Sequence, residues 1–311
     1  MKTISIVIPA YNEENNIAPL TTAIKSFFPH HRYQYEIIFI DDGSTDNTLT
    51  QIQKIAQQDK HVFYLELSRN FGHQNALKAG IDYATGDCVI TMDCDMQHPP
   101  HLLNSLIEKW EEGYDIVYTR RIENQNTSLV KKESGKIYYH IFNWLAEVNI
   151  EKGTADFRLM DRRVVEIFTG FNENDLFIRG LIPWLGFKQT AINYEPNERL
   201  SGKTKYSLRK MFLLAINGIT SLSIRPLYAA IYLGLTISLL AILAIPFVII
   251  SFQPHRHIIF IWASILIAIA FFGGMQLTIL GTIGLYIGKI FLQVKHRPLY
   301  IVRKTNIPDH Q

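Results

Sequence analysis

The sequence predicts an α/β protein with a doubly wound, mostly parallel sheet, followed by an interfacial helix and a two-helix transmembrane hairpin. Up to residue 206, short β-branched apolar runs alternate with segments of helical periodicity, a pattern typical of a parallel sheet covered by helices. From residue 227 onward, Ile, Leu, Ala, Phe and Gly dominate. This change of composition divides the 311-residue chain, although its average hydrophobic content is 48%.

The first part of the chain contains four strands separated by helices. Each strand is a short apolar run that ends in turn-forming residues, as buried parallel strands do. Ser44, Thr45 and Asp46 supply N-cap residues for the second helix. The expected order is strand 4–10, helix 15–28, strand 35–43, a helix after 41–48, strand 61–67, helix 74–84 and strand 87–93, then strand 115–121 and an amphipathic helix at 135–148.

Two apolar stretches, 227–252 and 258–292, each exceed the roughly 20 residues that cross a bilayer. The polar break between them is short, which predicts a transmembrane hairpin. Residues 207–223 place an apolar stripe away from Arg209 and Lys210, which favours a helix in the membrane interface over a packed core helix. The expected units are a domain at 1–206, a juxtamembrane helix at 207–226, the hairpin at 227–292 and a cytoplasmic tail at 293–311.

Basic residues flank the predicted hairpin, whereas its connecting loop contains Arg256 alone. This distribution predicts a multi-pass protein of the cytoplasmic membrane with both ends in the cytoplasm. The start of the chain does not resemble a signal peptide, because its apolar run is short and leads into two glutamates. The flanking basic residues are Arg199, Lys203, Lys205, Arg209, Lys210 and Arg225 on one side, and Lys289, Lys295, Arg297, Arg303 and Lys304 on the other.

Charge and cysteine content exclude other classes. A net charge of +3 without interleaved basic and aromatic residues does not indicate a nucleic-acid binder. Cys88 and Cys94 fall on one expected strand, about 20 Å apart by the rise of a strand, so a disulfide is excluded and a reducing compartment fits. Gly284 and Gly288 form a Gly-x-x-x-Gly pair, which serves either oligomerisation or packing within the hairpin.

Two carboxylates follow the strand that contains Cys88, at Asp93 and Asp95, and Gln97 comes two residues later. On an extended segment, residues two apart face the same side. Three oxygen-bearing side chains would then converge on one point and suit Mg²⁺ or Mn²⁺. A solvated acidic turn is the alternative.

The ends of the first two strands contain further polar side chains. Asp41 and Asp42 can accept hydrogen bonds from a base or a ribose hydroxyl, although one of them can equally cap the next helix. Tyr11, with Glu13 close behind, can stack on a base. The phosphate-binding loop of NTPases and the dinucleotide fingerprint of Rossmann oxidoreductases are both missing from the sequence.

Five motifs together resemble the family-two glycosyltransferases with a GT-A fold. They are "VIPAYNEE", "FIDDGSTDNT", "SRNFGHQNALKAG", "MDCDMQHPP" and "GTADFRLMDR". The segment "ERLSGKTKYSLRKM" before the hairpin is similar to the polyprenyl-phosphate glycosyltransferase branch. That branch includes dolichol-phosphate mannose synthases and bacterial undecaprenyl-phosphate sugar transferases.

The resemblance implies a nucleotide-sugar donor, a divalent metal (Mg²⁺ or Mn²⁺) and a polyprenyl-phosphate acceptor. Cys94 stands where the family usually has Ala or Pro, a change conservative in size. The implied donor residues are Pro9, Tyr11, Glu13, Asp41, Asp42 and Asp93, and the implied metal ligands are Asp93, Asp95 and Gln97.

Two basic clusters have roles that the reaction requires. Arg199, Lys203 and Lys205 can close over the donor phosphates, or contact anionic lipid. Arg120, Arg121, Lys131 and Lys132 bracket a polar loop and can hold the acceptor phosphate, with a solvated basic loop as the alternative.

Asp156 matches the family's candidate for the catalytic base. A phosphate monoester has a second pKa of about 6 and needs little help to lose a proton. Asp156 therefore acts as a base, orients the acceptor or sugar, or stabilises positive charge at the anomeric carbon. An ion pair with Arg158 or Arg162 is the structural alternative.

The sequence favours inverting transfer of a single sugar to undecaprenyl or polyprenyl phosphate over two alternatives. A processive polysaccharide synthase usually has more spans and a Gln-x-x-Arg-Trp motif, whereas Arg179 and Trp184 are too far apart here. A non-catalytic scaffold would have no need to keep Asp95 and Asp156. The sequence does not identify the transferred sugar, and it favours UDP over GDP as the nucleotide of the donor.

Overall fold

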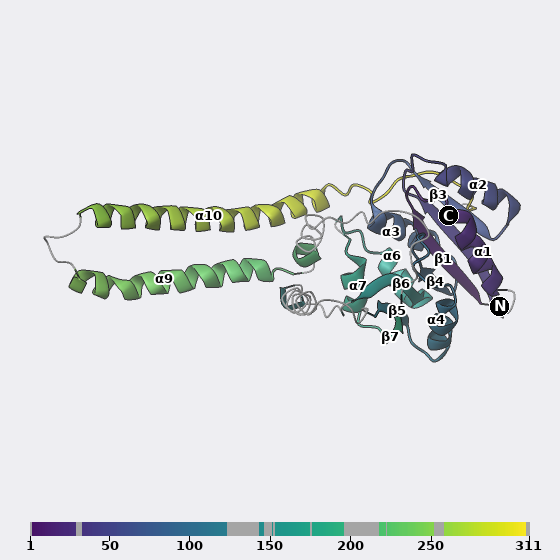
Figure 1. Ribbon diagram of the computed structural model, residues 1–311, viewed down its shortest axis with the longest axis horizontal. Coiled ribbons are helices and arrows are strands. Elements are labelled where there is room, and N and C mark those ends of the chain that lie inside the picture. The colour runs from purple at the N-terminus through teal and green to yellow at the C-terminus, as the bar shows by residue number, and fades with distance from the viewer. Residues whose placement is uncertain are drawn as a thin grey trace.

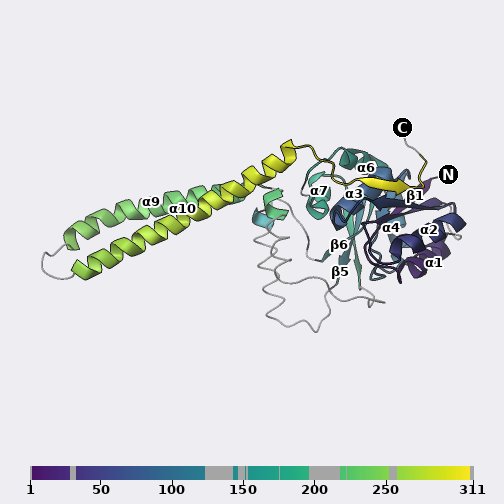
Figure 2. The same cartoon turned by 90° about the horizontal axis from the view of Figure 1, so that it is seen from above.

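The structure, a computed structural model, describes residues 2–28, 33–122, 143–145, 151, 153–174, 176–195, 218–221, 223–251 and 258–308. Within these residues, a sheet with helices on both faces forms the body of the molecule. Two long helices project from one side of it (Figures 1 and 2). The predicted α/β class with a mostly parallel sheet is confirmed.

Four parallel strands in the order β4-β1-β2-β3 form one half of the sheet. Successive residues of β1 face opposite sides, so that Ile6 packs in the core that contains α1 and Val7 in the core that contains α3. All of these elements were expected from the sequence. They are β1 (Thr3–Ala10), α1 (Ile17–Phe27), β2 (Gln34–Asp41), α2 (Thr48–Gln58), β3 (Val62–Leu67), α3 (His73–Tyr83) and β4 (Cys88–Thr91).

The other half of the sheet is mixed. β6 (Thr154–Asp161) runs antiparallel between β4 and β5 (Ile116–Arg121), and β7 (Gln189–Tyr194) pairs in parallel with β5. The strand β5 was expected, whereas β6 and β7 were not. Helices α4 (Leu102–Glu111), α6 (Arg162–Thr169) and α7 (Ile178–Trp184) complete the described part of this half.

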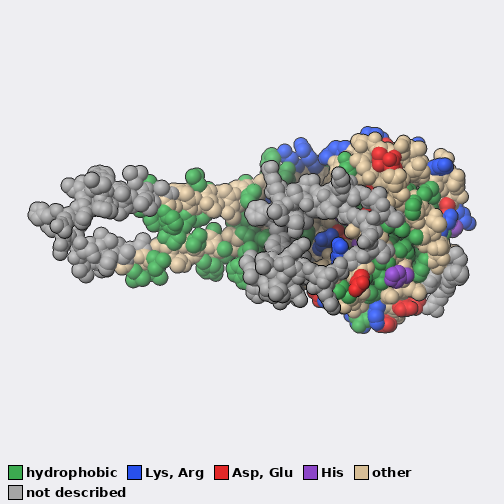
Figure 3. Space-filling view, viewed as in Figure 1, with side chains coloured by type: hydrophobic (Ala, Val, Ile, Leu, Met, Phe, Trp, Pro, Cys, Tyr) green, Lys and Arg blue, Asp and Glu red, His purple; other side chains and the backbone are tan. Residues whose placement is uncertain are grey.

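The two projecting helices, α9 (Arg225–Ser251) and α10 (Ile258–Val294), lie side by side in both views. They coincide with the two apolar stretches of the sequence. Among the described residues, Phe271–Val294 is the one stretch that passes a test of length and apolar composition for crossing a membrane. Figure 3 shows hydrophobic side chains along this pair of helices, whereas charged side chains gather on the sheet domain.

The chain returns from α10 to the sheet, which the sequence did not predict. β8 (Val302–Thr305) pairs antiparallel with β3 at the sheet edge. Asn306 accepts a hydrogen bond from the Tyr64 backbone N–H at 2.7 Å. The segment expected as a tail thus contributes a strand to the N-terminal domain.

Two expected helices fall mostly outside the described residues. Within the expected helix 135–148, residues 143–145 are described and are helical. Within the expected interfacial helix 207–223, residues 218–221 are described and are helical.

Candidate active site

The carboxyl ends of β1, β2 and β4 meet at one edge of the sheet, because the three strands are parallel neighbours. The loops after β1 and β2 are tied together there. The Asn12 backbone N–H donates to Ser44 Oγ at 3.0 Å, and the Thr45 backbone N–H donates to Asn12 Oδ1 at 2.8 Å. Asn12 has a φ of 56°, a left-handed conformation that Asn tolerates better than most residues.

The two aspartates at the end of β2 have different surroundings. Both oxygens of Asp42 accept backbone N–H groups, from Phe71 at 2.7 Å and Gly72 at 3.0 Å, so this carboxylate fixes the start of α3. Asp41 is 2% exposed, and its Oδ1 has no hydrogen-bond partner. Burial raises the pKa of both carboxyl groups. A buried acceptor without a partner is costly, so Asp41 Oδ1 can accept a hydrogen bond from a bound molecule.

The residues expected from the first strand lie at the same edge. Pro9 is a buried residue of β1 paired with Ile40, and Tyr11 is 39% exposed beyond the strand end. The Glu13 backbone N–H donates to Thr48 Oγ1 at 2.8 Å, which joins this loop to α2. The structure therefore brings Pro9, Tyr11 and Glu13 to the same edge as Asp41.

The loop after β4 is a turn, not an extended strand. β4 ends at Thr91, Cys94 and Asp95 lie in a turn, and Met96 has a φ of 61°. The expectation that Cys88 and Cys94 share a strand is therefore wrong, and both thiols are buried and unpaired. The Gln97 backbone N–H donates to Asp95 Oδ1 at 3.1 Å.

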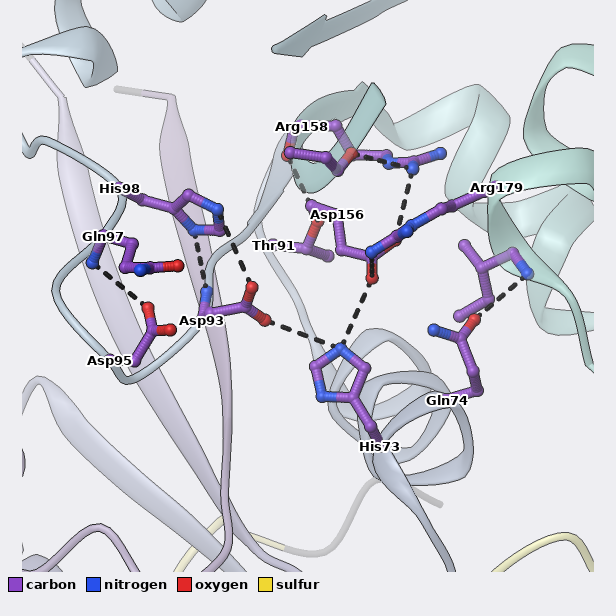
Figure 4. A network of polar contacts seen from close by, with 12 residues as sticks. His73, Gln74, Thr91, Asp93, Asp95, Gln97, His98, Asp156, Arg158 and Arg179 are labelled. Carbon is purple, nitrogen blue, oxygen red and sulfur yellow. Dashed lines mark hydrogen bonds and ion pairs between the residues drawn. The ribbon is translucent and has the colours of Figure 1, made fainter. Parts of the chain in front are cut away.

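The three expected metal ligands, Asp93, Asp95 and Gln97, all lie on the loop that contains this turn. Figure 4 shows the Asp93 carboxylate between His98 and His73, with Asp95 and Gln97 next to one another further along the loop. The described residues contain no group of three or more His, Cys, Asp or Glu side chains that could hold a metal ion. Asp95 and Gln97 nevertheless supply two hard oxygen donors on one turn, and Mg²⁺ is commonly held by one or two carboxylates together with substrate phosphates. The donor set thus fits a divalent ion that a diphosphate helps to bind.

Asp156 lies beside the loop after β4, because β6 pairs with β4. The register places Thr91 opposite Arg158, and the Thr91 hydroxyl donates to the Asp156 carbonyl. The Asp156 carboxylate is almost fully buried and accepts two hydrogen bonds from Arg179, at 2.9 and 2.8 Å. Arg158 and His73 Nε2 each lie 3.5 Å from it.

The charges in this cluster support one another. Burial opposes ionisation of Asp156, but Arg179 and His73 outweigh it and hold the pKa of this carboxyl well below its usual range. Desolvation likewise opposes protonation of His73, whereas Asp156 and Asp93 raise its pKa to about 9. Burial lowers the pKa of Arg158 to about 10. His73 Nε2 lies 3.5 Å from both Asp93 and Asp156 and joins the two carboxylates (Figure 4).

The expected acceptor cluster is only partly described. Arg120 pairs with Glu151 at 2.7 Å and donates to Asn193 at 2.7 Å. Arg120 and Arg121 are neighbours on β5, so their side chains leave opposite faces of the strand. Lys131, Lys132, Arg199, Lys203 and Lys205 lie outside the described residues.

A family model described as "Glycosyl transferase family 2" matches residues 5–168. The chain belongs to glycosyl transferase family 2. It is 42% identical, over 96% of its length and 94% of the relative's, to an uncharacterized glycosyltransferase of Synechocystis sp.. It is also 37% identical, over 97% and 98% of the two chains, to the SfII prophage-derived bactoprenol glucosyl transferase of Shigella flexneri. The predicted family resemblance is confirmed.

A solved structure supports the fold of this family 2 member. Mannosyl-3-phosphoglycerate synthase from Rubrobacter xylanophilus superposes with a TM-score of 0.51 over 70% of this chain and 71% of that one, at 15% identity. At that identity the similarity shows the GT-A-like fold alone.

Three residues of the site, His73, His98 and Arg179, were not predicted to belong to it. His73 and His98 lie within two of the family 2 motifs, and this position was the sequence signal that could have identified them as site residues. Arg179 is 23 residues from Asp156 along the chain and reaches it through α7. Only the unexpected pairing of β6 with β4 places that carboxylate where Arg179 can bind it.

Proposed function

We propose that this protein is a membrane-anchored, inverting glycosyltransferase. It moves one sugar from a nucleotide sugar, with UDP favoured, to undecaprenyl phosphate or a similar polyprenyl phosphate. The main support is the similarity to bactoprenol glucosyl transferases, which extends over 97% of this chain and includes α9 and α10 as well as the sheet domain.

The nucleotide would bind at the ends of β1 and β2. Asp41 Oδ1 is a buried acceptor without a partner, and a base N–H or a ribose hydroxyl supplies the hydrogen that it lacks. Tyr11 is partly exposed and offers a face on which a base can stack. Both oxygens of Asp42 accept hydrogen bonds from the loop before α3, so this carboxylate holds that loop beside Asp41.

Asp95 and Gln97 would hold the divalent ion, Mg²⁺ or Mn²⁺. When bound, the ion stabilises negative charge on the departing diphosphate as a Lewis acid. Asp93 lies between this turn and His73, at the boundary of the donor and transfer sites (Figure 4). Arg199, Lys203 and Lys205 remain predicted partners of the donor phosphates.

The transfer itself exchanges one bond at the anomeric carbon. An oxygen of the acceptor phosphate attacks that carbon, the bond to the nucleoside diphosphate breaks, and the configuration inverts. The phosphate is largely dianionic at neutral pH and needs no strong base. Both oxygens of Asp156 accept hydrogen bonds from Arg179, so we assign Asp156 an orienting role, with Arg120, Arg121, Lys131 and Lys132 as predicted contacts of the acceptor.

The membrane anchor would be a hairpin of α9 and α10, with the sheet domain and the chain end on one side. β8 follows α10 and pairs with β3 of the sheet domain. The chain therefore leaves this domain and returns to it, which requires an even number of crossings. The basic residues on both flanks of the hairpin favour the cytoplasm for that side.

A donor panel tests this function directly. Purified protein in detergent receives undecaprenyl phosphate, Mg²⁺ or Mn²⁺, and UDP- or GDP-sugars in turn, with lipid products detected by mass spectrometry. We expect one donor to give a product that contains a single sugar, and EDTA to abolish it. Asp95→Ala should abolish transfer, whereas Glu108→Ala, on an exposed position of α4, should retain it.

Other outcomes identify what is wrong. A ladder of sugars on one lipid would indicate a processive enzyme. Binding of a UDP-sugar without any product would point to a different acceptor. Neither binding nor product, in protein shown to be folded, would support a scaffold instead.

A further inference from the structure

His98 is packed rigidly beside the loop after β4. The residue is 4% exposed. Its ring stacks on Phe157, with ring centroids 4.9 Å apart and planes 20° from parallel, and it makes an edge contact with the Tyr194 ring at a centroid distance of 6.0 Å. Phe157 is a fully buried core residue of β6. The position of the imidazole is therefore fixed by the core of the sheet, not by the loop that carries it.

Both ring nitrogens of His98 face Asp93. The Asp93 backbone N–H donates to His98 Nδ1 at 3.2 Å, and His98 Nε2 lies 3.7 Å from Asp93 Oδ2 (Figure 4). Because Nδ1 accepts a hydrogen bond, it carries a lone pair, and the ring proton must be on Nε2. In this tautomer Nδ1 accepts from the Asp93 backbone, and the Nε2–H lies near the Asp93 carboxylate at a distance longer than a hydrogen bond.

The segment between these two residues has little freedom of its own. Met96 is in the left-handed region at φ 61°, and the Asp95 carboxylate accepts the Gln97 N–H within the turn. Pro99 follows His98 and restricts its backbone to extended conformations. Because the His98 ring accepts a hydrogen bond from the Asp93 backbone, the two ends of the segment that carries Asp95 and Gln97 are held together.

We propose that His98 is a positioning residue of the donor site, which fixes the Asp93 backbone through Nδ1 and so sets the turn that presents Asp95 and Gln97. This inference rests on the proposed function for the ligand, a nucleoside diphosphate with its divalent ion. The contact between His98 and Asp93 is a property of the protein alone. Residues that orient metal-binding loops typically change metal affinity or activity by about 10- to 100-fold when replaced.

His98→Phe separates the polar role from packing, because it keeps an aromatic ring against Phe157 and removes both nitrogens. We expect the Asp93 amide to exchange its hydrogen at least about tenfold faster, since it loses its buried acceptor. We also expect half-saturation by Mn²⁺ in the presence of UDP, followed by the EPR signal of free Mn²⁺, to require about 10-fold more metal. His98→Asn, whose Oδ1 can accept in place of Nδ1, should recover part of the exchange protection.

Tyr194→Phe is the matched control, because it keeps the ring beside His98 and both histidine nitrogens. It should leave exchange at Asp93 and Mn²⁺ binding unchanged. Wild-type exchange and Mn²⁺ binding in His98→Phe would overturn the proposal.

A measurement on the wild-type protein covers the case in which His98→Phe does not fold. Nitrogen-15 NMR of labelled histidine should show His98 with an unprotonated Nδ1 and a protonated Nε2. The opposite tautomer would overturn the proposal. Because hydrogen exchange and the tautomer are measured without donor or metal, their failure is distinguishable from failure of the proposed glycosyl transfer.

Discussion

The carboxylate of Asp156 is surrounded by three cationic side chains, of which Arg179 is the nearest. Arg179 binds it through two hydrogen bonds, while Arg158 and His73 lie 3.5 Å away. A buried charge depends on its partners, because removing one of them leaves the charge both desolvated and incompletely paired. Arg179 is therefore the main partner of the buried Asp156 charge.

Arg179→Ala tests this arrangement. We expect the free energy of unfolding to fall by about 1.5–3 kcal/mol, the range for a hydrogen bond to a charged group. Sugar transfer should fall at least about tenfold, because a misplaced group in a positioned site is costly. Denaturant unfolding and the donor assay measure the two effects.

Arg163→Ala is the control for Arg179→Ala. The Arg163 side chain is 72% exposed and pairs with Asp115 and Asp161, whose side chains are 15% and 17% exposed. Surface pairs typically contribute about 0–1 kcal/mol, so stability and transfer should change little. Equal losses in both variants would show that the Asp156 cluster has no special role.

At the scale of elements, an ion pair joins α1 to the end of α2. Lys25 of α1 lies 2.7 Å from Asp59, the C-cap of α2, and His61 lies 3.0 Å from the same carboxylate. Burial opposes ionisation of Asp59, but Lys25 and His61 prevail and lower its pKa to about 2. Since this pKa is lower in the folded protein, Asp59 stabilises the fold above about pH 4 and loses that effect as the pH falls toward 2.

Asp59→Asn should therefore destabilise the protein by about 1–2 kcal/mol at pH 7. The difference from wild type should shrink below pH 4 and vanish near pH 2. Unfolding free energies measured between pH 7 and pH 2 provide the comparison. Glu112→Gln, which breaks an exposed pair with Lys109, should show no such trend, and a constant deficit in Asp59→Asn would contradict the assignment.

The sequence predicted the elements whose pattern is local. β1 to β4 and their helices follow from apolar runs that end in turn residues, and the residues at the ends of β1 and β2 met as expected because parallel neighbours share an edge. The prediction for Asp93, Asp95 and Gln97 assumed an extended strand, whereas Met96 at φ 61° belongs to a turn. Local hydrophobic periodicity does not report contacts between residues that are distant in sequence. The pairing of β6, the pairing of β8 and the contact of Arg179 with Asp156 are contacts of this kind.

β8 is the element that joins the chain end to the sheet. Asn306 accepts from the Tyr64 N–H at 2.7 Å and donates to the Val62 carbonyl at 3.2 Å. Asn306→Ala should lower the free energy of unfolding by about 1–2 kcal/mol, because it removes both bonds to the edge of β3. Lys304→Ala, at an exposed position of β8, should leave it unchanged, and equal stability of the two variants would show that β8 adds little.

On the scale of the whole molecule, α9 and α10 form a projecting helix pair, and the chain returns from it to the sheet domain (Figure 1). Where this helix pair meets the sheet domain, the Gln293 side chain of α10 donates to the Asn172 carbonyl at 2.8 Å and accepts from the Asn174 N–H at 3.0 Å. Leu277 and Val294 of α10 are 72% and 68% exposed. Apolar surface of this extent requires a cover, and a bilayer would provide it while these contacts keep the active site close to lipid.

Cysteine labelling decides whether the pair of helices α9 and α10 crosses the membrane. The native thiols of Cys88 and Cys94 are buried, so an impermeant maleimide should leave them unmodified in the folded protein. Arg256→Cys, in the connection between α9 and α10, should react in intact cells, because a hairpin that crosses the bilayer exposes this loop on the far side. Lys304→Cys on β8 should react only after permeabilisation, because β8 pairs with the sheet domain. If both positions react only after permeabilisation, the two helices lie on the cytoplasmic surface and the proposed hairpin topology is wrong.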